Sequence, residues 1–366
     1  MVALSMADGY ARVTNKPQCV IVHVDVGTQG LGAAMHNASC GRVPVLIFAG
    51  LSPHTIEGEL RGSRTEYIHW IQDVPDQKQI VAQYCRYVGE IKTGKNVKQI
   101  VNRALQFAMS DPKGPVYLMG AREVMEEEIE PYKLIQEHWA PVEPTALPPS
   151  GVSAIATALV DAESPLVITG YCGRNHAAVP ELVKLADTIK GLRVLDTTGS
   201  DVCFPATHPG WLGLRYGIDD GILEADAILV IDCDVPWVNT FCHPGPGARI
   251  FHVDVDPLKT QMPVFYLAAT KRYRAESLTA FRQLNDFLAT DPRATASLQD
   301  PKFAARWTAL EKSHSTLLSS LAALALPPAP SDPAPKITTP HLASLLRALC
   351  PPTTIFAIEA VTNTLH

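Results

Sequence analysis

Residues 1–30 read MVALSMADGYARVTNKPQCVIVHVDVGTQG, a possible helix, a strand and a glycine-rich loop in succession. Apolar residues recur at helical spacing from Ala3 to Ala11, which predicts a helix over 1–13 with one face ready to pack. The run over 18–24 is largely apolar, as expected of a strand that is covered on both faces. A helix followed by such a strand indicates an α/β domain with a parallel sheet.

The same alternation continues along the rest of the chain. The patterns predict further helices over 31–40, 97–109, 151–161, 177–189, 275–288, 302–323 and 341–349. They predict further strands over 45–48, 116–119, 166–169, 193–196, 227–231, 250–253 and 354–358. The predicted fold class is therefore α/β, with two parallel-sheet domains.

Two proline-rich stretches punctuate this pattern, PVEPTALPP at 141–149 and PPAPSDPAP at 327–335. Proline lacks an amide donor and disfavours helix in the residue before it, so both stretches are expected to be extended linkers. The sequence therefore predicts two domains, over 1–140 and 151–326, and a C-terminal segment over 338–366. Linkers over 141–150 and 327–337 separate them.

Composition narrows the class of protein. The chain has 366 residues, 46% hydrophobic and 19% charged, which is typical of a globular protein with ample core. Its net charge of -6 provides no basic field for a nucleic-acid backbone, so we expect no nucleic-acid partner. The apolar runs are too short to cross a bilayer, and no membrane partner is expected.

Eight cysteines are scattered without any Cys-x-x-Cys pair, which favours reduced thiols and a cytoplasmic protein over a disulfide framework. A mitochondrial location is the alternative if a targeting segment precedes Met1. Cys233, Cys242 and His243 are candidate metal ligands because their side chains can bind zinc. No fourth ligand stands at zinc spacing, and the residues therefore predict no metal site of their own.

The helix over 1–13 carries a further pattern, formed by Ala3, Ala7 and the tetrapeptide GYAR at 9–12. It resembles the thiamine diphosphate-dependent enzymes, a family that includes acetolactate synthase, 2-oxo acid decarboxylases and 2-hydroxyacyl-CoA lyases. In the family pattern a Glu stands three residues before the first Ala, which is one place ahead of Met1. The resemblance thus implies a chain that lacks this catalytic Glu, and we expect it to be truncated at both ends.

The resemblance also assigns the predicted domains. It implies a partial pyrimidine-binding domain over 1–140, a Rossmann-like central domain over 151–326 and, over 338–366, the start of a missing diphosphate-binding domain. Family members hold the diphosphate through Mg²⁺, bound to a Gly-Asp-Gly motif and a later Asn, and this sequence contains no Gly-Asp-Gly. The nearest match, GIDDG at 217–221, is interpreted as a turn and helix N-cap.

The loop DVGTQG at 25–30 follows a predicted strand and opens a helix. Such loops can offer backbone amides and a helix dipole to an anion or a polar ring. The alternative interpretation is that the glycines only permit a tight turn. In the family the corresponding Gly-Pro-Gly-x-x-Asn loop lies against the aminopyrimidine ring of the cofactor. The resemblance makes Gly27, Thr28, Gln29 and Gly30 the candidate cofactor-binding residues, with Asp25 and Val26 replacing Gly-Pro and Gly30 replacing Asn.

A polar, charged loop follows the strand at 45–48 and extends to about residue 70. In relatives the equivalent loop reaches toward the reacting carbon and often offers a Gln or a His. The resemblance makes His69 the candidate substrate-loop residue. The alternative is a solvated charged loop that Trp70 anchors to the core.

Relatives bind FAD or an adenine nucleotide in the central domain, or leave it empty. Gly170 and Gly173 are too widely spaced for Gly-x-Gly, although Asp254 or Asp256 could supply the acid of a dinucleotide site. A purely structural domain is the preferred interpretation, and FAD is the alternative. The basic run at 271–274 is predicted to be a solvated turn.

Three functional hypotheses follow. The first is an enzyme homologue of the acetolactate synthase or 2-oxo acid decarboxylase type, which forms or cleaves C–C bonds next to a carbonyl in a 2-oxo acid or acyl-CoA. Thiamine diphosphate and Mg²⁺ are its implied cofactors, and a homo-oligomer or a partner chain is expected. The site would be complete only with a partner chain that supplies Glu, Asp and Asn, so we expect the isolated chain to be inactive. The second is a noncatalytic remnant or oligomerisation partner of a full-length relative. The third is a nucleotide-binding module.

Overall fold

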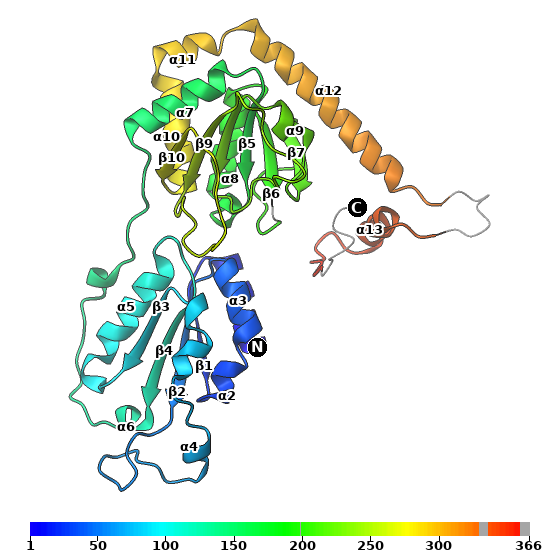
Figure 1. The fold of residues 1–366 in the computed structure, drawn as a ribbon. Coiled ribbons are helices and arrows are strands. Elements are labelled where there is room, and N and C mark those ends of the chain that lie inside the picture. Colours follow the sequence, from blue (N-terminus) through cyan, green and yellow to red (C-terminus); the bar gives the residue numbers. More distant parts are fainter. Residues whose placement is uncertain (198, 329–335, 359–366) are drawn as a thin grey trace. The chain divides into compact units, whose positions relative to one another are not determined.

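A computed structural model describes residues 1–197, 199–328 and 336–358 (Figure 1). The chain divides into two compact units, Met1–Thr145, here called unit 1, and Ala146–His366, called unit 2. Each unit contains one sheet in which every pairing is parallel. The predicted α/β class with two parallel sheets is confirmed.

Unit 1 has a four-stranded sheet in the order β1-β2-β4-β3. Its strands are β1 (Gln18–Val22), β2 (Val45–Leu51), β3 (Tyr87–Ile91) and β4 (Val116–Ala121). Its α-helices are α1 (Val2–Thr14), α2 (Val26–Gln29), α3 (Gly32–Cys40), α4 (Ile68–Ile71), α5 (Val97–Met109) and α6 (Arg122–Met125). Short 3₁₀ turns occupy η1 (Gln77–Ile80), η2 (Ala82–Tyr84), η3 (Gly94–Asn96) and η4 (Gln136–Trp139).

Alternate residues of the central strands of unit 1 point to opposite faces of the sheet, and both faces are buried. Ile47 and Tyr117 pack with Leu4 of α1 and Met35 of α3 on one face. Leu46 and Leu118 pack with α5 on the other. This double burial explains why β2 and β4 are apolar without alternation.

Unit 2 has a six-stranded sheet in the order β10-β9-β8-β5-β6-β7. Its strands are β5 (Pro165–Thr169), β6 (Arg193–Thr197), β7 (Trp211–Arg215), β8 (Ala227–Ile231), β9 (Arg249–Asp254) and β10 (Lys271–Arg274). Its helices are α7 (Pro149–Asp161), η5 (Cys172–Arg174), α8 (Ala178–Thr188), α9 (Asp220–Glu224), α10 (Ser277–Thr290), α11 (Pro292–Ser297), α12 (Pro301–Leu324) and α13 (Thr339–Leu349). The strand order reverses between β5 and β8, which is the usual place for a ligand in such a sheet.

Two predictions about the strands were wrong. The basic run Lys271–Arg274 is not a turn but the edge strand β10, parallel to β9. Charged side chains suit an edge, where they discourage pairing with another chain. Residues 354–358 form no strand, and the segment 359–363, in which the predicted C-terminal domain would continue, lies outside the described residues.

Within the described ranges, none of the helices combines the length and the apolar character that crossing a membrane requires.

Candidate functional site

The carboxyl ends of the four parallel strands of unit 1 meet at one edge of the sheet, called here the carboxyl edge. The loop after β1 carries the predicted residues Gly27–Gly30, and the loop after β2 carries His69. Both predicted groups therefore lie on segments that leave the same edge. The loop after β4 begins with α6.

The glycine-rich loop folds as a single helical turn, α2, rather than as an open loop. The amides of Gly27, Gln29 and Gly30 donate to the carbonyls of Val24, Asp25 and Val26 at 3.3, 2.9 and 3.0 Å. These three amides are thus not offered to an anion, in contrast to what the sequence suggested. Any ligand at this edge would be held by side chains and by the shape of the loop.

Close packing explains why position 27, the first glycine of the loop, has no side chain. A Cβ atom on Gly27 would lie 3.1 Å from Cβ of His23 and 3.2 Å from Cβ of Val22, tighter than ordinary contact. Asp25 has a positive φ of 45°, which a residue other than Gly or Asn rarely adopts. Its carboxylate accepts a hydrogen bond from the Gln29 side chain at 2.6 Å. The loop is therefore tightly constrained by its own contacts.

A buried polar network connects the loop to the strand ends, and the sequence analysis missed it. The hydroxyls of Thr28 and Tyr117 are 2.8 Å apart, and both side chains are buried. Nε2 of Gln77 donates to the Tyr117 hydroxyl at 2.8 Å and to the Gly50 carbonyl at 2.9 Å, while Oε1 accepts from the Asp25 amide at 2.7 Å. Burial raises the pKa of Tyr117, so its hydroxyl stays protonated at neutral pH. Thr28 is therefore a buried structural contact of this loop.

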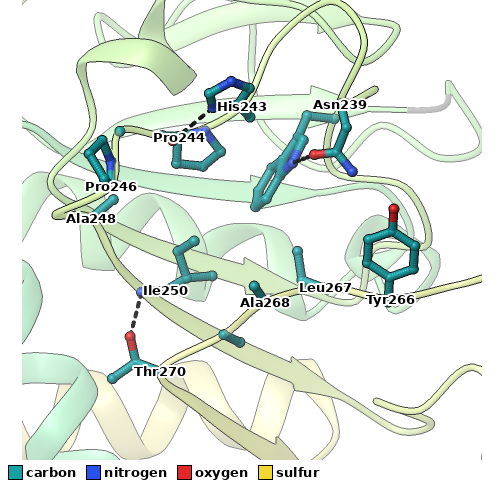
Figure 2. A pocket seen from close by; sticks show the side chains of 13 residues that line it. Asn239, His243, Pro244, Pro246, Ala248, Ile250, Tyr266, Leu267, Ala268 and Thr270 are labelled. Carbon is teal, nitrogen blue, oxygen red and sulfur yellow. Dashed lines mark hydrogen bonds between the residues drawn. The ribbon is translucent and has the colours of Figure 1, made fainter.

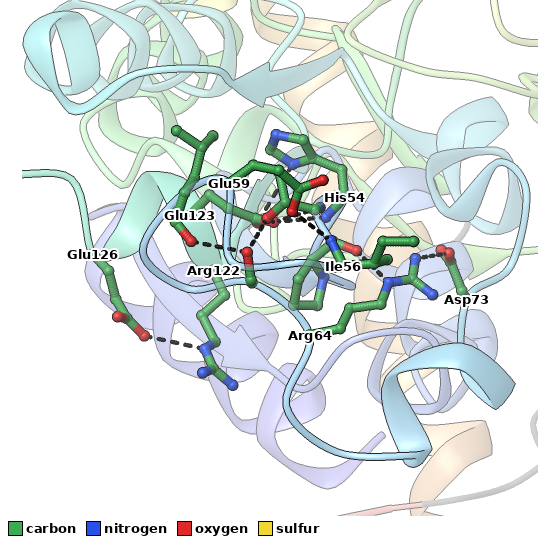
Figure 3. Close-up of polar contacts among 12 residues, drawn as sticks. His54, Ile56, Glu59, Arg64, Asp73, Arg122, Glu123 and Glu126 are labelled. Atoms are coloured by element: carbon green, nitrogen blue, oxygen red, sulfur yellow. Dashed lines mark hydrogen bonds and ion pairs between the residues drawn. The ribbon is translucent and has the colours of Figure 1, made fainter.

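The loop after β2 is fixed by the carboxylate of Glu123, whose side chain is only 3% exposed (Figure 3). Its Oε1 accepts hydrogen bonds from the His54 amide at 2.8 Å, the Thr55 amide at 2.9 Å and the Thr55 hydroxyl at 2.7 Å. Burial alone would raise the pKa of Glu123, but the hydrogen bonds from Thr55 and His54 outweigh it and hold the pKa below its ordinary value. The carboxylate is therefore ionised and committed to this loop.

Other contacts hold the same loop. Gly62 has φ of +86°, and a Cβ atom there would lie 2.8 Å from the Arg122 backbone. Arg64 donates to the Pro53 carbonyl at 2.7 Å and pairs with Asp73 (Figure 3). The loop is thus ordered, although many of its side chains face solvent.

His69 lies on α4 and is 8% exposed. Its Nδ1 accepts a hydrogen bond from the Thr65 amide at 3.3 Å, which leaves Nε2 as the nitrogen able to act on a ligand. That His69 contacts a substrate stays a prediction. The expected anchor, Trp70, is 49% exposed, so the interpretation in which it ties the loop to the core was wrong.

Metal ligands are not gathered anywhere in the described ranges, where no group of three or more His, Cys, Asp or Glu side chains could hold an ion. Cys242 instead contacts the Asp219 carbonyl, and Cys233 contacts the Thr197 hydroxyl. Asp219 caps α9, and its Oδ1 accepts from the Gly221 amide at 2.8 Å. The interpretation of 217–221 as a turn and N-cap is confirmed.

The switch point of unit 2 is closed by its own backbone. The amides of Gly170 and Tyr171 donate to the Asp232 carbonyl at 3.2 and 3.0 Å, and thus link the loops after β5 and β8. Of the two candidate acids, Asp254 pairs with Lys259 at 2.5 Å, and Asp256 accepts from the Thr260 amide and hydroxyl at 2.7 and 2.8 Å. Because these groups are already bonded, the arrangement favours a structural role over dinucleotide binding.

A cavity of about 420 Å³ lies instead on the amino-terminal side of β9 (Figure 2). Trp237, Asn239, Ile250 and Thr270 are among the residues that line it, and none of the lining residues is Lys, Arg, Asp or Glu. The cavity therefore has no Lys or Arg side chain to pair with a phosphate or a carboxylate.

Asp196, at the end of β6, gives a pH-dependent prediction for unit 2. It is 6% exposed, its Oδ2 accepts from the Cys203 amide at 3.0 Å, and its Oδ1 has no partner in the described part of the chain. Burial raises its pKa from 3.8 to about 6, although the Cys203 hydrogen bonds oppose this. The native state therefore holds the proton more tightly than the unfolded chain, and ionised Asp196 destabilises unit 2 increasingly from pH 4 to pH 6.

We expect Asp196→Asn to raise the free energy of unfolding of unit 2 by about 2 kcal/mol at pH 7.5, because the neutral amide needs no dehydrated charge. The gain should largely vanish at pH 4, where Asp196 is protonated in the native state. Urea unfolding followed by the fluorescence of Trp211, which neighbours β6, would measure both values. An equal gain at the two pH values would contradict this account.

Comparison with known proteins identifies the fold. The family model "Thiamine pyrophosphate enzyme, N-terminal TPP binding domain" matches residues 1–80. The model for the central domain of the same enzymes matches residues 152–264. The chain belongs to the thiamine pyrophosphate enzyme family. Thiamine pyrophosphate is another name for thiamine diphosphate, so the resemblance in the N-terminal helix is confirmed.

Among curated relatives, a benzoylformate decarboxylase of Pseudomonas aeruginosa is 25% identical over 265 residues, which cover 69% of this chain and 48% of that protein. A putative acetolactate synthase large subunit of Mycobacterium tuberculosis is 25% identical over 270 residues, covering 69% and 47%. The chain therefore spans about half the length of the curated relatives it matches.

Solved structures of the family share the fold. The benzoylformate decarboxylase from Polynucleobacter necessarius superimposes with a TM-score of 0.64 at 19% identity, covering 77% of this chain and 52% of that one. A thiamine diphosphate-dependent 4-hydroxybenzoylformate decarboxylase of Rhodococcus jostii gives a TM-score of 0.59 at 23% identity, covering 77% and 53%.

The described residues fit one end of the thiamine pyrophosphate cofactor and not the other. At the carboxyl edge of unit 1, a constrained glycine-rich loop stands on a largely buried polar network, as a surface for one face of a ring requires. The diphosphate and its magnesium have no such match, because no ligand cluster is present in the described ranges. The residues present thus fit the ring end of the cofactor and not the metal end.

Proposed function

We propose that this chain provides the pyrimidine-side half of a thiamine diphosphate site, in an enzyme that forms or cleaves a C–C bond next to a carbonyl. One observation carries the proposal: the loop Val26–Gln29 and its buried network lie at the carboxyl edge of the unit whose first 80 residues match the N-terminal TPP binding domain. The names of the relatives, benzoylformate decarboxylase, acetolactate synthase and 2-hydroxyacyl-CoA lyase, favour a 2-oxo acid or an acyl-CoA as substrate.

In this proposal the chain's own residues bind and orient. The loop Gly27–Gly30 lies against the aminopyrimidine ring, with its shape set by the network beneath it rather than by free amides. His69 presents Nε2 to the substrate, where the ring nitrogen can form a hydrogen bond with a polar group. When bound, the cofactor would supply an electron sink for the C–C bond that forms or breaks next to the substrate carbonyl.

The remaining parts of the site are assigned to a partner chain. These parts are the Glu that exchanges a proton with the aminopyrimidine and the oxygen ligands of magnesium. A row of exposed apolar side chains on α1 supports association with another chain: Val2, Met6, Tyr10 and Val13 are between 61% and 75% exposed. We propose a homo-oligomer or a hetero-oligomer in the cytoplasm, with the mitochondrion as the second location. Only a different chain, in a hetero-oligomer, would supply the Glu and the magnesium ligands.

Calorimetry tests whether the chain needs a partner to complete the cofactor site. We expect the purified 366-residue chain alone to show no magnesium-dependent binding of thiamine diphosphate at micromolar cofactor, because the charge of the diphosphate is unmatched. A full-length benzoylformate decarboxylase, titrated in the same buffer with and without Mg²⁺, is the positive control. Tight binding that disappears on chelation of Mg²⁺ would show that the chain holds a complete site, and would overturn the assignment to a partner.

A further inference from the structure

Gln77 is a buried side-chain amide that connects β2, β4 and the segment that follows β1 in unit 1. It lies on η1 and is 2% exposed. Its Oε1 accepts from the Asp25 amide after β1, and its Nε2 donates to the Gly50 carbonyl in β2 and to the Tyr117 hydroxyl in β4. All three distances lie between 2.7 and 2.9 Å, and both amide protons are used.

The bond to Asp25 holds an unusual backbone conformation. Asp25 has φ of 45° and ψ of -86°, outside the regions that L residues favour. Such a conformation persists only where surrounding contacts enforce it. The amide of Asp25 is turned toward Gln77, and this hydrogen bond is a contact that enforces the start of the glycine-rich loop.

The bond to Tyr117 fixes the other part of the loop. The Tyr117 hydroxyl accepts a hydrogen bond from Gln77 and lies 2.8 Å from Oγ1 of Thr28, a contact in which either hydroxyl can be the donor. Chains of this kind polarise one another in a dry interior and hold a single arrangement. One side chain therefore determines the positions of both Asp25 and Thr28, which flank the first glycine of the loop.

We propose that Gln77 is the positioning residue of the ring-binding loop, acting through Asp25 and through Tyr117 and Thr28 rather than by touching the cofactor. The proposal rests on the proposed function, because it assumes that the loop receives the aminopyrimidine ring. It deepens that function by assigning the shape of the ring surface to a residue about 50 positions further along the chain.

A matched control separates positioning from ordinary core stability. Gln77→Met keeps the length of the side chain and removes all three hydrogen bonds. Asn102→Leu removes a comparable buried amide, 7% exposed, that pairs with Gln136 at 2.9 Å and lies on α5, away from the loop. Tyr117→Phe is the milder second variant, since it removes the hydroxyl that joins Gln77 to Thr28 but leaves the bonds of Gln77 to Asp25 and Gly50 in place.

Hydrogen exchange of the unliganded chain is the first readout. Gln77→Met should speed amide exchange across residues 25–30 about tenfold relative to β2 and β4, while Asn102→Leu should not. Tyr117→Phe should speed exchange near Thr28 and leave the Asp25 amide protected. Unchanged exchange at 25–30 in both Gln77→Met and Tyr117→Phe, or an equal rise in Asn102→Leu, would overturn the positioning role.

The second readout is the dissociation constant of thiamine, which carries the ring without the diphosphate, measured by NMR titration at millimolar ligand. We expect wild type and Asn102→Leu to bind alike, Gln77→Met to bind about tenfold more weakly and Tyr117→Phe to fall between them. Equal affinity in all four would refute the effect on ring binding. If the wild type binds no thiamine, the proposed function fails, and the exchange data alone decide whether Gln77 sets the loop.

Discussion

Lys259→Met is expected to lower the free energy of unfolding of unit 2 by about 3 to 5 kcal/mol. The ammonium of Lys259 is 2% exposed and lies 2.5 Å from Asp254 and 2.7 Å from Asp234. The side chain of Asp254 is completely buried, so removal of the lysine leaves a dehydrated carboxylate without its cation. An uncompensated buried charge destabilises far more than the loss of the contact itself.

The double variant Lys259→Met/Asp254→Asn tests this reason. It should recover most of the lost stability, because a neutral amide replaces the stranded charge and its oxygen can still accept from the Asp256 amide. Lys312→Met, at an exposed position of α12, is the control and should be near neutral. The measurement is denaturant unfolding, combined with amide exchange in β8 and β9. If Lys259→Met lowers the free energy of unfolding by less than about 1 kcal/mol, water must reach Asp254.

Glu123→Leu is expected to release the loop over 52–66, at a free-energy cost of about 3 kcal/mol. Three donors from His54 and Thr55 lose an ionised acceptor, and hydrogen bonds to a charged group contribute more than neutral ones. The donors can regain water only if the loop leaves the protein. We therefore expect local opening rather than collapse of the whole sheet.

Limited proteolysis between residues 54 and 66, together with the melting temperature of unit 1, measures the two effects separately. Glu126→Ala removes a half-exposed carboxylate that pairs with Arg122 on the same helix, and should change neither readout. Rapid cleavage of the loop in Glu123→Leu with an intact sheet is the expected result. A loop that stays resistant would show that Gly62 and Arg64 hold it without Glu123.

The sequence predicts the buried elements of this fold better than the exposed ones. β2, β4, β5 and β8 are apolar over their length, and their burial on both faces made them visible. β3, β7 and β10 lie at sheet edges with partly exposed side chains, and no hydrophobic pattern marked them. Edge strands are determined by pairing with a neighbour, which is not encoded within the segment itself.

The residues of the candidate site also differ in whether the sequence could predict them. Gly27 and Thr28 could be selected because they form a short motif next to a strand. Gln77, Tyr117 and Glu123 could not, because their partners lie 27 to 89 residues away and only the folded sheet brings them together. Nor could the internal bonding of the loop amides be foreseen, since it depends on the backbone turning into α2.

The placement of β4 between β2 and β3 has a consequence for biosynthesis. Both neighbours precede it in the chain, so on the ribosome each waits with an unpaired edge until Val116–Ala121 has emerged. At ordinary elongation rates, the interval between the end of β2 and the start of β4 is roughly 3 to 13 s. During that interval the nascent chain exposes the open edge of the apolar strand β2 to solvent, and we expect a chaperone that covers extended segments to act at this stage of translation.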